Sequence, residues 1–268
     1  MKPHATLAAI TVTLTSMAPI ALAHPDGHDG TPAPLHVDDS YDECFFDLHP
    51  ELTQAEFDEF AREGGVVMHD LQLASAEAMR PGDFEVSLDF SRTVIDDSKG
   101  AWNNTMSHPT SDHWLGHTRA FPRLSARAGV SRRVGVGVWG TLDPRANYGF
   151  LGMHSKVTVV EQDDATPVSV AVRPTAVALL GPEELLVLDL GIDASVSRSY
   201  KGLSPYVGLA AHTTAAFERS NDVDLDPGTA WTTAAFAGLA YAWRGVRVAA
   251  HGEAGPLNVL AARVGGAF

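Results

Sequence analysis

Two polar stretches of the 268-residue sequence contain side chains that could take part in chemistry. The first stretch contains His108, Asp112, His113 and His117, and the last two histidines are four residues apart. On a helix their imidazoles would share one face and could bind a metal ion. Asp112 and His113 could instead form the catalytic pair of a surface hydrolase. Pro109 and the absence of a helical pattern favour a polar surface loop over both hypotheses.

The second stretch alternates aspartate with other residues and contains Asp222, Asp224 and Asp226. Such spacing could place oxygen atoms around Ca²⁺, but a calcium loop of the helix–loop–helix type needs Gly at its sixth position and Glu at its twelfth. Counted from Asp222, these positions hold Pro227 and Thr233. We therefore favour a solvated acidic loop. No Gly-rich phosphate-binding motif is present either, so the sequence predicts no cofactor.

The N-terminus carries the features of an export signal. Lys2 precedes an apolar stretch from Ala5 to Leu22, which ends in the small-residue motif Ala21-Leu22-Ala23. We expect residues 1–23 to be a signal peptide that is cleaved after Ala23. No run of 18 apolar residues follows, so no transmembrane helix is expected. The net charge of -14 argues against a nucleic-acid partner.

Residues 24–81 are predicted to form a periplasmic tail and one short helix. Thr53 and Glu56 have the spacing of a capping box, in which each side chain bonds the backbone of the other residue. The helix is expected to end at Gly64-Gly65. Its narrow apolar stripe needs a support, which we expect to be the periplasmic mouth or the inside of a barrel formed by residues 82–268. Val66–Met79 is ambiguous between helix and strand. The lone Cys44, which precedes the helix, cannot form an internal disulfide.

Residues 82–268 repeatedly alternate apolar and polar side chains, the period of a strand with two different faces. Phe84, Val86 and Leu88, for example, alternate with Glu85 and Ser87. The pattern predicts about ten strands of roughly 9–14 residues, long enough to cross a bilayer at a tilt. With both termini in the periplasm, the inner turns are short and the outer loops include the two longest connectors, as in membrane barrels.

The chain ends in the alternating stretch Val259–Phe268, whose last residue is aromatic. A terminal strand with this pattern resembles the closing strand of bacterial outer-membrane β-barrel proteins of the small, OmpA-like transmembrane type. The resemblance is architectural, covers residues 82–268 and matches no particular member. It implies an all-β fold, an antiparallel up-and-down transmembrane β-barrel of about ten strands, between eight and twelve. The alternative is a periplasmic β-sandwich, which would also show alternation.

The same resemblance implies a location in the bacterial outer membrane. The partners would be outer-membrane lipid and the barrel-assembly machinery, for which Phe268 would act as an assembly signal. The surface ligand, if there is one, cannot be named from the sequence. Asp-His pairs occur in the ten-stranded omptin proteases of this membrane, and that similarity underlies the hydrolase hypothesis for Asp112 and His113.

Charged residues of opposite sign occupy the inward positions of neighbouring predicted strands, where cross-strand side chains can meet. They are Glu85, Asp89, Arg123, Arg127, Arg173, Asp189, Asp193, Arg247, Glu253 and Arg263. Because buried charges must be paired, we predict that ion pairs among them close the lumen. The favoured function is a closed barrel that acts through its surface loops or in envelope integrity. The alternatives are a small-solute pore or transporter and a surface hydrolase, and a non-enzymatic role is favoured.

Overall fold

The computed structural model describes residues 46, 48–96, 98–106, 121–141 and 148–268. The predicted signal peptide, the tail with Cys44, and the candidates His108, Asp112, His113 and His117 lie outside the described residues. No helix in the described ranges is long and apolar enough to cross a membrane.

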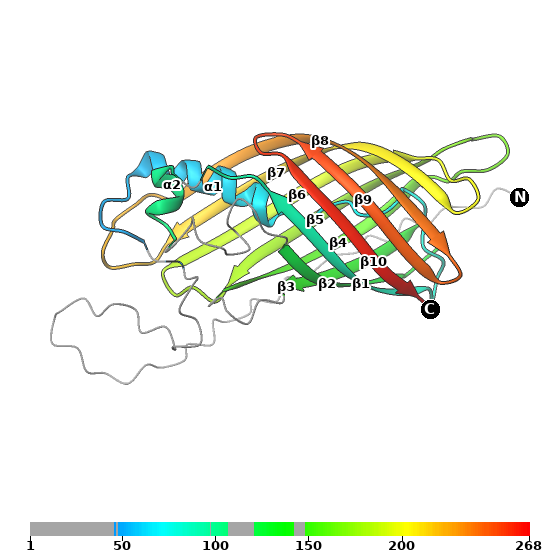
Figure 1. The fold of residues 1–268 in the computed structure, drawn as a ribbon, viewed down its shortest axis with the longest axis horizontal. Helices are drawn as coiled ribbons and strands as arrows, with labels where there is room; N and C mark the ends of the chain where they lie inside the picture. The colour runs from blue at the N-terminus through cyan, green and yellow to red at the C-terminus, as the bar shows by residue number, and fades with distance from the viewer. Residues whose placement is uncertain (1–45, 47, 97, 107–120, 142–147) are drawn as a thin grey trace, which may run out of the picture. The chain divides into compact units, whose positions relative to one another are not determined.

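The described residues form ten strands that close into one antiparallel barrel (Figure 1). The strands are β1 Phe84–Thr93, β2 Phe121–Gly129, β3 Val134–Thr141, β4 Gly149–Val160, β5 Ser169–Leu180, β6 Leu185–Ser197, β7 Leu203–Glu218, β8 Gly228–Trp243, β9 Val246–Ala254 and β10 Val259–Ala267. Each strand pairs with its neighbours along the chain, and β1 pairs with β10 to close the ring. The predicted all-β class and the count of about ten strands are confirmed, and closure excludes the β-sandwich.

The seam between β1 and β10 has a regular register in which Asp89 lies opposite Arg263 and Glu85 opposite Ala267. Backbone hydrogen bonds between Phe84 and Phe268 extend the pairing to the last residue. We call the barrel end where β1 begins and β10 ends the base. We call the opposite end, where β1 ends, β2 begins and the connection 219–227 lies, the rim. The base turns 130–133, 198–202 and 244–245 are short.

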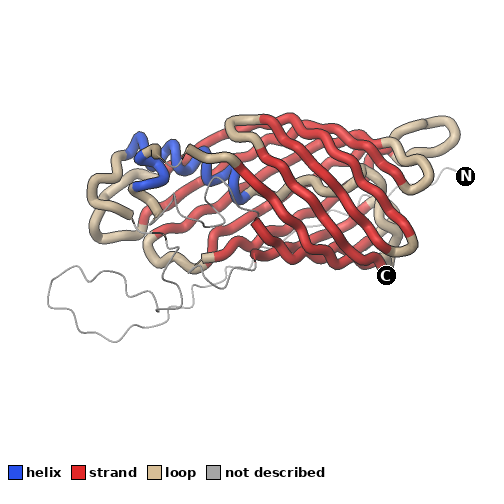
Figure 2. The backbone as a smooth tube through the Cα atoms, viewed as in Figure 1, coloured by secondary structure: helices blue, strands red, loops and turns tan. Residues whose placement is uncertain are grey.

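Two helices, α1 Gln54–Met68 and the short α2 Gly100–Asn103, lie at the rim (Figures 1 and 2). The predicted capping box is present, because Thr53 Oγ1 accepts from the Glu56 backbone and the Glu56 carboxylate accepts from the Thr53 backbone. Helix α1 contacts β6, β7 and β8, so its support is the barrel itself. It belongs to the same compact unit as the strands.

The expected helix end at Gly64-Gly65 is wrong, because α1 continues through both glycines to Met68. Gly65 serves close packing instead of chain reversal. A Cβ added there would lie 1.9 Å from Thr214 Oγ1 on the inner wall of β7. Residues 69–80, which we call the lumen segment, contain neither helix nor strand. This part of the ambiguous stretch Val66–Met79 is therefore irregular, and only its first three residues are helical.

The lumen contains an apolar region at the rim end. Phe57 and Phe60 of α1 pack there with Trp102 of α2 and with Phe150 and Val187 of the barrel wall. The Phe60 and Trp102 rings meet edge to face with centroids 5.4 Å apart. Burying these rings stabilises α1 against the wall, since large aromatic side chains dominate core energetics.

Candidate functional site in the barrel lumen

The strand period sends alternate side chains into the lumen, and all ten charged residues expected there occupy inward positions. Glu85 on β1 is 1% exposed and Asp189 on β6 is fully buried. Such burial is costly for a charge unless it is paired and hydrogen-bonded. The partners of these charges therefore decide what the lumen can do.

Asp89 and Arg263 form a two-pronged ion pair across the β1–β10 seam. Arg263 donates from Nε to Asp89 Oδ1 at 2.6 Å and from Nη2 to Oδ2 at 2.5 Å. Ser125 on β2 donates a third hydrogen bond to this carboxylate. Arg263 also donates to the backbone carbonyl of Leu73 at 3.2 Å, which links the seam to the lumen segment.

Glu85 forms ion pairs with two arginines. Arg127 on β2 donates from Nη2 to one carboxylate oxygen, and Arg247 Nε on β9 lies 3.3 Å from the other. Two positive charges thus share a single carboxylate. An ionised carboxylate has two acceptor oxygens, so each oxygen can face one guanidinium.

Arg173 on β5 joins the wall to the lumen segment. Its Nε donates to Asp193 on β6 at 2.9 Å. Its Nη1 lies 2.9 Å from Asp70 Oδ1, and its Nη2 donates to the Asp70 backbone carbonyl at 2.8 Å. The Asp70 carboxylate also lies 2.7 Å from Nδ1 of His154 on β4. Arg173 therefore links the carboxylate of Asp70 in the lumen segment to the carboxylate of Asp193 in the barrel wall.

Three of the expected charges meet histidine or backbone atoms. Asp189 accepts from Thr214 at 2.9 Å and lies 3.2 Å from His212 Nδ1. Glu253 lies 3.1 Å from Nε2 of His69, the first residue of the lumen segment. Arg123 lies opposite Asp89 in the register of β1 and β2. Its guanidinium donates to the carbonyls of Val67 and His69.

The lower part of the lumen segment is held through its backbone. Lys156 Nζ on β4 donates to the carbonyls of Ser75 and Glu77 at 3.1 and 2.6 Å. Thr158 donates to the Ala76 carbonyl, and the Ala76 N–H donates to Ser197 Oγ on β6, both at 2.9 Å. The wall side chains thus satisfy backbone groups of a segment that has neither helix nor strand to bond them.

Outside the strands, Lys99 fixes α2 to α1. Its ammonium donates to Glu59 at 2.8 Å and to Glu63 at 2.7 Å, and Trp102 Nε1 donates to the other oxygen of Glu63. The hydrogen bonds to Glu59 and then Glu63 raise the pKa of Lys99 above its ordinary value. The chain after β1 thereby holds the helix that precedes it.

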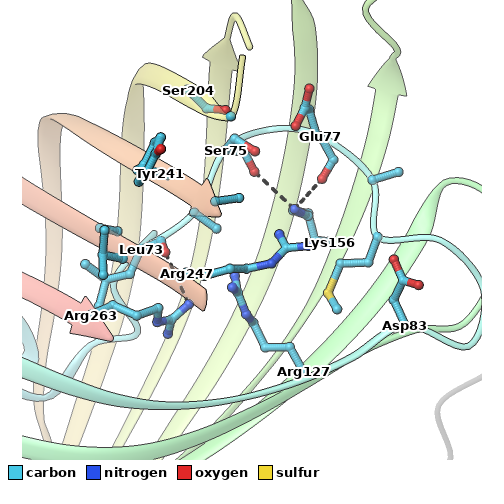
Figure 3. Close-up of a pocket in the computed structure, with 18 of the residues that line it drawn as sticks. Leu73, Ser75, Glu77, Asp83, Arg127, Lys156, Ser204, Tyr241, Arg247 and Arg263 are labelled. Carbon is cyan, nitrogen blue, oxygen red and sulfur yellow. Dashed lines mark hydrogen bonds between the residues drawn. The ribbon is translucent and has the colours of Figure 1, made fainter. Parts of the chain in front are cut away.

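A cavity of about 360 Å³ opens at the base, between the lumen segment and the strands (Figure 3). We call it the base cavity. Lys156, Arg127, Arg247 and Arg263 line it together with Leu73 and Ser75. Figure 3 shows the side-chain nitrogens of the first three directed to its middle and the carboxylates of Glu77 and Asp83 at its margin.

No protein-family model and no curated protein sequence matches this chain. Solved structures with a similar arrangement are outer-membrane barrels. The COG4313 outer membrane channel from Pseudomonas putida F1 is 10% identical over 74% of this chain and 100% of its own, with a TM-score of 0.46. LpxR from Salmonella typhimurium is 9% identical over 68% of this chain and 99% of its own, with a TM-score of 0.37. The N-terminal barrel domain of Pseudomonas aeruginosa OprF is 14% identical over 71% and 100%, with a TM-score of 0.29. These similarities are too distant to assign an activity.

The acidic candidates at the rim are not gathered around a common point. Asp222, Asp224 and Asp226 are exposed on the β7–β8 connection. The backbone of Asp226 instead exchanges two hydrogen bonds with the Gln54 side chain at the start of α1. Across the described ranges, no group of three or more His, Cys, Asp or Glu side chains is arranged to hold a metal ion.

Sequence reasoning missed the lumen segment and two of the wall side chains that contact it, Lys156 and His154. Lys156 and His154 occupy alternate positions on β4, so strict alternation along that strand would have placed both in the lumen. No comparable signal exists for His69 and Asp70. Their position follows from tertiary contacts with Glu253 and Arg173, not from a local pattern.

Proposed function

We propose that this chain is a bacterial outer-membrane β-barrel protein with a closed lumen, acting through its surface loops or in envelope integrity. Support for a membrane location comes from the outward face. Leu190, Leu209 and Leu260 on three different strands are each more than 60% exposed. A barrel with an apolar outer face and a polar interior fits a bilayer, where closure also leaves no unpaired strand edge.

Aromatic side chains add to this support. Trp243 and Tyr241 near the base and Trp231 near the rim are exposed on β8. Trp and Tyr at the two ends of a membrane-spanning strand suit the headgroup layers, because one part of each ring system is apolar and the other is polar. The proposed partners are accordingly outer-membrane lipid and, during insertion, the barrel-assembly machinery.

The observation that carries the closed lumen is the path of residues 54–80. Helix α1 packs against wall residues near the rim, Asp70 meets Arg173 farther down, and the carbonyls of Ser75 and Glu77 meet Lys156 near the base. A barrel of this size has an interior that side chains can largely fill. Here a segment of the chain fills it together with them.

Conductance in a planar bilayer tests the closed lumen. The wild-type protein is expected to give no steady current steps, and liposomes containing it should not swell in a small sugar. A variant with Arg173→Ala and Lys156→Ala loses the wall contacts to Asp70 and to the carbonyls of Ser75 and Glu77. It is expected to show brief openings. The control Arg198→Ala changes an exposed base-turn arginine and should stay silent. Large, steady steps from the wild type would contradict the closed lumen and favour the pore.

A further inference from the structure

We infer that the base cavity is a binding site for a small dianion of the phosphate-monoester class, held by Lys156, Arg127 and Arg247. The inference rests on the proposed closed lumen, because residues of the lumen segment form one wall of the cavity. It adds to that proposal a ligand class and a position in the barrel.

The charges around the cavity do not balance. Lys156, Arg127, Arg247 and Arg263 line it, whereas the wall carboxylates paired with these groups are Glu85 and Asp89 alone among the described residues. With Arg80, Glu77 and Asp83, which also line the cavity, the total is five positive groups against four carboxylates. The group formed by Lys156, Arg127, Arg247 and Arg263 with its two paired carboxylates keeps an excess of two positive charges. Two of the four are deeply buried, since Lys156 is 8% and Arg263 is 7% exposed. A bound dianion would neutralise this excess where water cannot do so efficiently.

The cavity also holds hydrogen-bond donors with spare capacity. An ammonium has three N–H donors, and Lys156 uses two of them on the carbonyls of Ser75 and Glu77. Within the described ranges, it has no carboxylate at ion-pair distance. The Nε atom of Arg127 is buried and without a hydrogen-bond partner. Arg247 is less buried than the others, with 39% of its side chain exposed, and can turn toward a ligand.

The chemistry of these donors favours phosphate. Arginine presents a planar fork that matches two phosphate oxygens, and lysine adds a compact point charge. A phosphate monoester carries close to two negative charges at neutral pH and offers three terminal oxygen acceptors. The volume of about 360 Å³ lies within the range of small-molecule sites. A phosphate group with a small substituent, such as a sugar, would fit both the charge and the space.

Calorimetric titration of the full-length protein with phosphate probes tests the site. The ionic strength is held constant, because a change in screening by salt would itself change the measured affinity. Glucose 6-phosphate and inorganic phosphate serve as soluble probes, and glucose serves as the uncharged control. We expect saturable binding of both phosphates and none of glucose. Lys156→Gln and Arg247→Gln should each weaken binding about tenfold or more, as loss of one charge-assisted contact does.

Arg198→Gln is the matched control, since it removes the same charge from an exposed turn at the base and should change the affinity less than about twofold. If Lys156→Gln does not fold, which loss of heat-modifiable migration on a detergent gel would show, the affinity of Arg247→Gln for the phosphate probes tests the site. A lipid source is separated by titrating dioleoyl phosphatidic acid in mixed micelles. Binding of that lipid but not of the soluble phosphates, with the same dependence on Lys156 and Arg247, would support the site with a lipid headgroup as its ligand.

Two results would overturn the inference. One is the absence of saturable binding of every phosphate probe at millimolar concentration. The other is equal weakening by Arg198→Gln and Arg247→Gln, which would show attraction to the base surface in general. Conductance of the same preparation keeps the two proposals apart. A silent barrel without phosphate binding removes the site alone, whereas a steadily conducting barrel removes the closed lumen.

Discussion

The two adjacent glycines of α1 are expected to respond in opposite directions to the same substitution. A Cβ added at Gly64 would lie 3.5 Å from the nearest ring atom of Phe60, an ordinary contact. A Cβ added at Gly65 would lie 1.9 Å from Thr214 Oγ1 on the wall. In either position, alanine improves helix propensity by about 1 kcal/mol over glycine. Gly64→Ala should therefore stabilise the protein by up to about 1 kcal/mol.

Gly65→Ala gains the same propensity but must resolve the overlap. Thr214 is fully buried, and its hydroxyl donates to Asp189 at 2.9 Å. Either α1 moves away from β7, or Thr214 rotates and gives up this bond. Overpacking costs about 1–3 kcal/mol and a lost hydrogen bond about 1 kcal/mol. Once the gain in propensity is subtracted, the expected net destabilisation is about 1–3 kcal/mol.

Urea unfolding of both variants in the same lipid, followed by tryptophan fluorescence, measures this difference. Trp102 is buried against Phe60 of α1, so its emission reports release of the helix. Equal and small effects at the two glycines would refute the close approach of α1 to the wall. Destabilisation by Gly64→Ala alone would indicate that Gly64, and not Gly65, lies on the face of α1 that packs against β7.

Three further predictions concern the ion pairs, the seam and the helix cap. Arg173→Ala leaves buried carboxylates without their cation, so urea unfolding should show a loss of about 3–5 kcal/mol, against about 0.5 kcal/mol or less for Arg198→Ala. The wild-type barrel should migrate differently on detergent gels before and after boiling. Deletion of Phe268 should lower the amount of the protein in outer-membrane fractions. An unchanged amount would tell against a role of Phe268 in assembly. A backbone hydrogen bond from Thr53 lowers the pKa of Glu56 below its ordinary value of 4.5. The cap is therefore fully stabilising above that pH and is weakened as the pH falls through the lowered pKa, so amide exchange in α1 should quicken in acid. Glu56→Gln, which keeps an acceptor oxygen but does not titrate, should remove most of this dependence.

The barrel could be predicted from the sequence because its signal is local and repeated. Each strand shows its two faces in the alternation itself, as in Phe84–Thr93, where Glu85 and Asp89 point inward and Phe84 and Phe90 outward. A closed sheet needs little more than this alternation and short turns on one side. The seam pairing of Asp89 with Arg263 follows from the register once closure is assumed.

The lumen segment could not be predicted, because its conformation is set by partners that are distant in sequence. His69 and Asp70 meet Glu253 and Arg173, and the backbone of residues 75–77 meets Lys156. An irregular chain has no period, and lysine bonds to carbonyls of any residue type. The Gly64-Gly65 pair misled for a related reason. Glycine allows both helix termination and close packing, and only the facing Thr214 distinguishes them.

The position of the lumen segment before β1 in the chain restricts the order in which the protein can assemble. The β1–β10 seam joins residues that are more than 160 positions apart, and its register can be completed only after β10 exists. The lumen segment depends on the same late strands, because His69 meets Glu253 on β9 and the Leu73 carbonyl accepts from Arg263 on β10. Its contacts, like the seam, are therefore complete only once the last strand is in place.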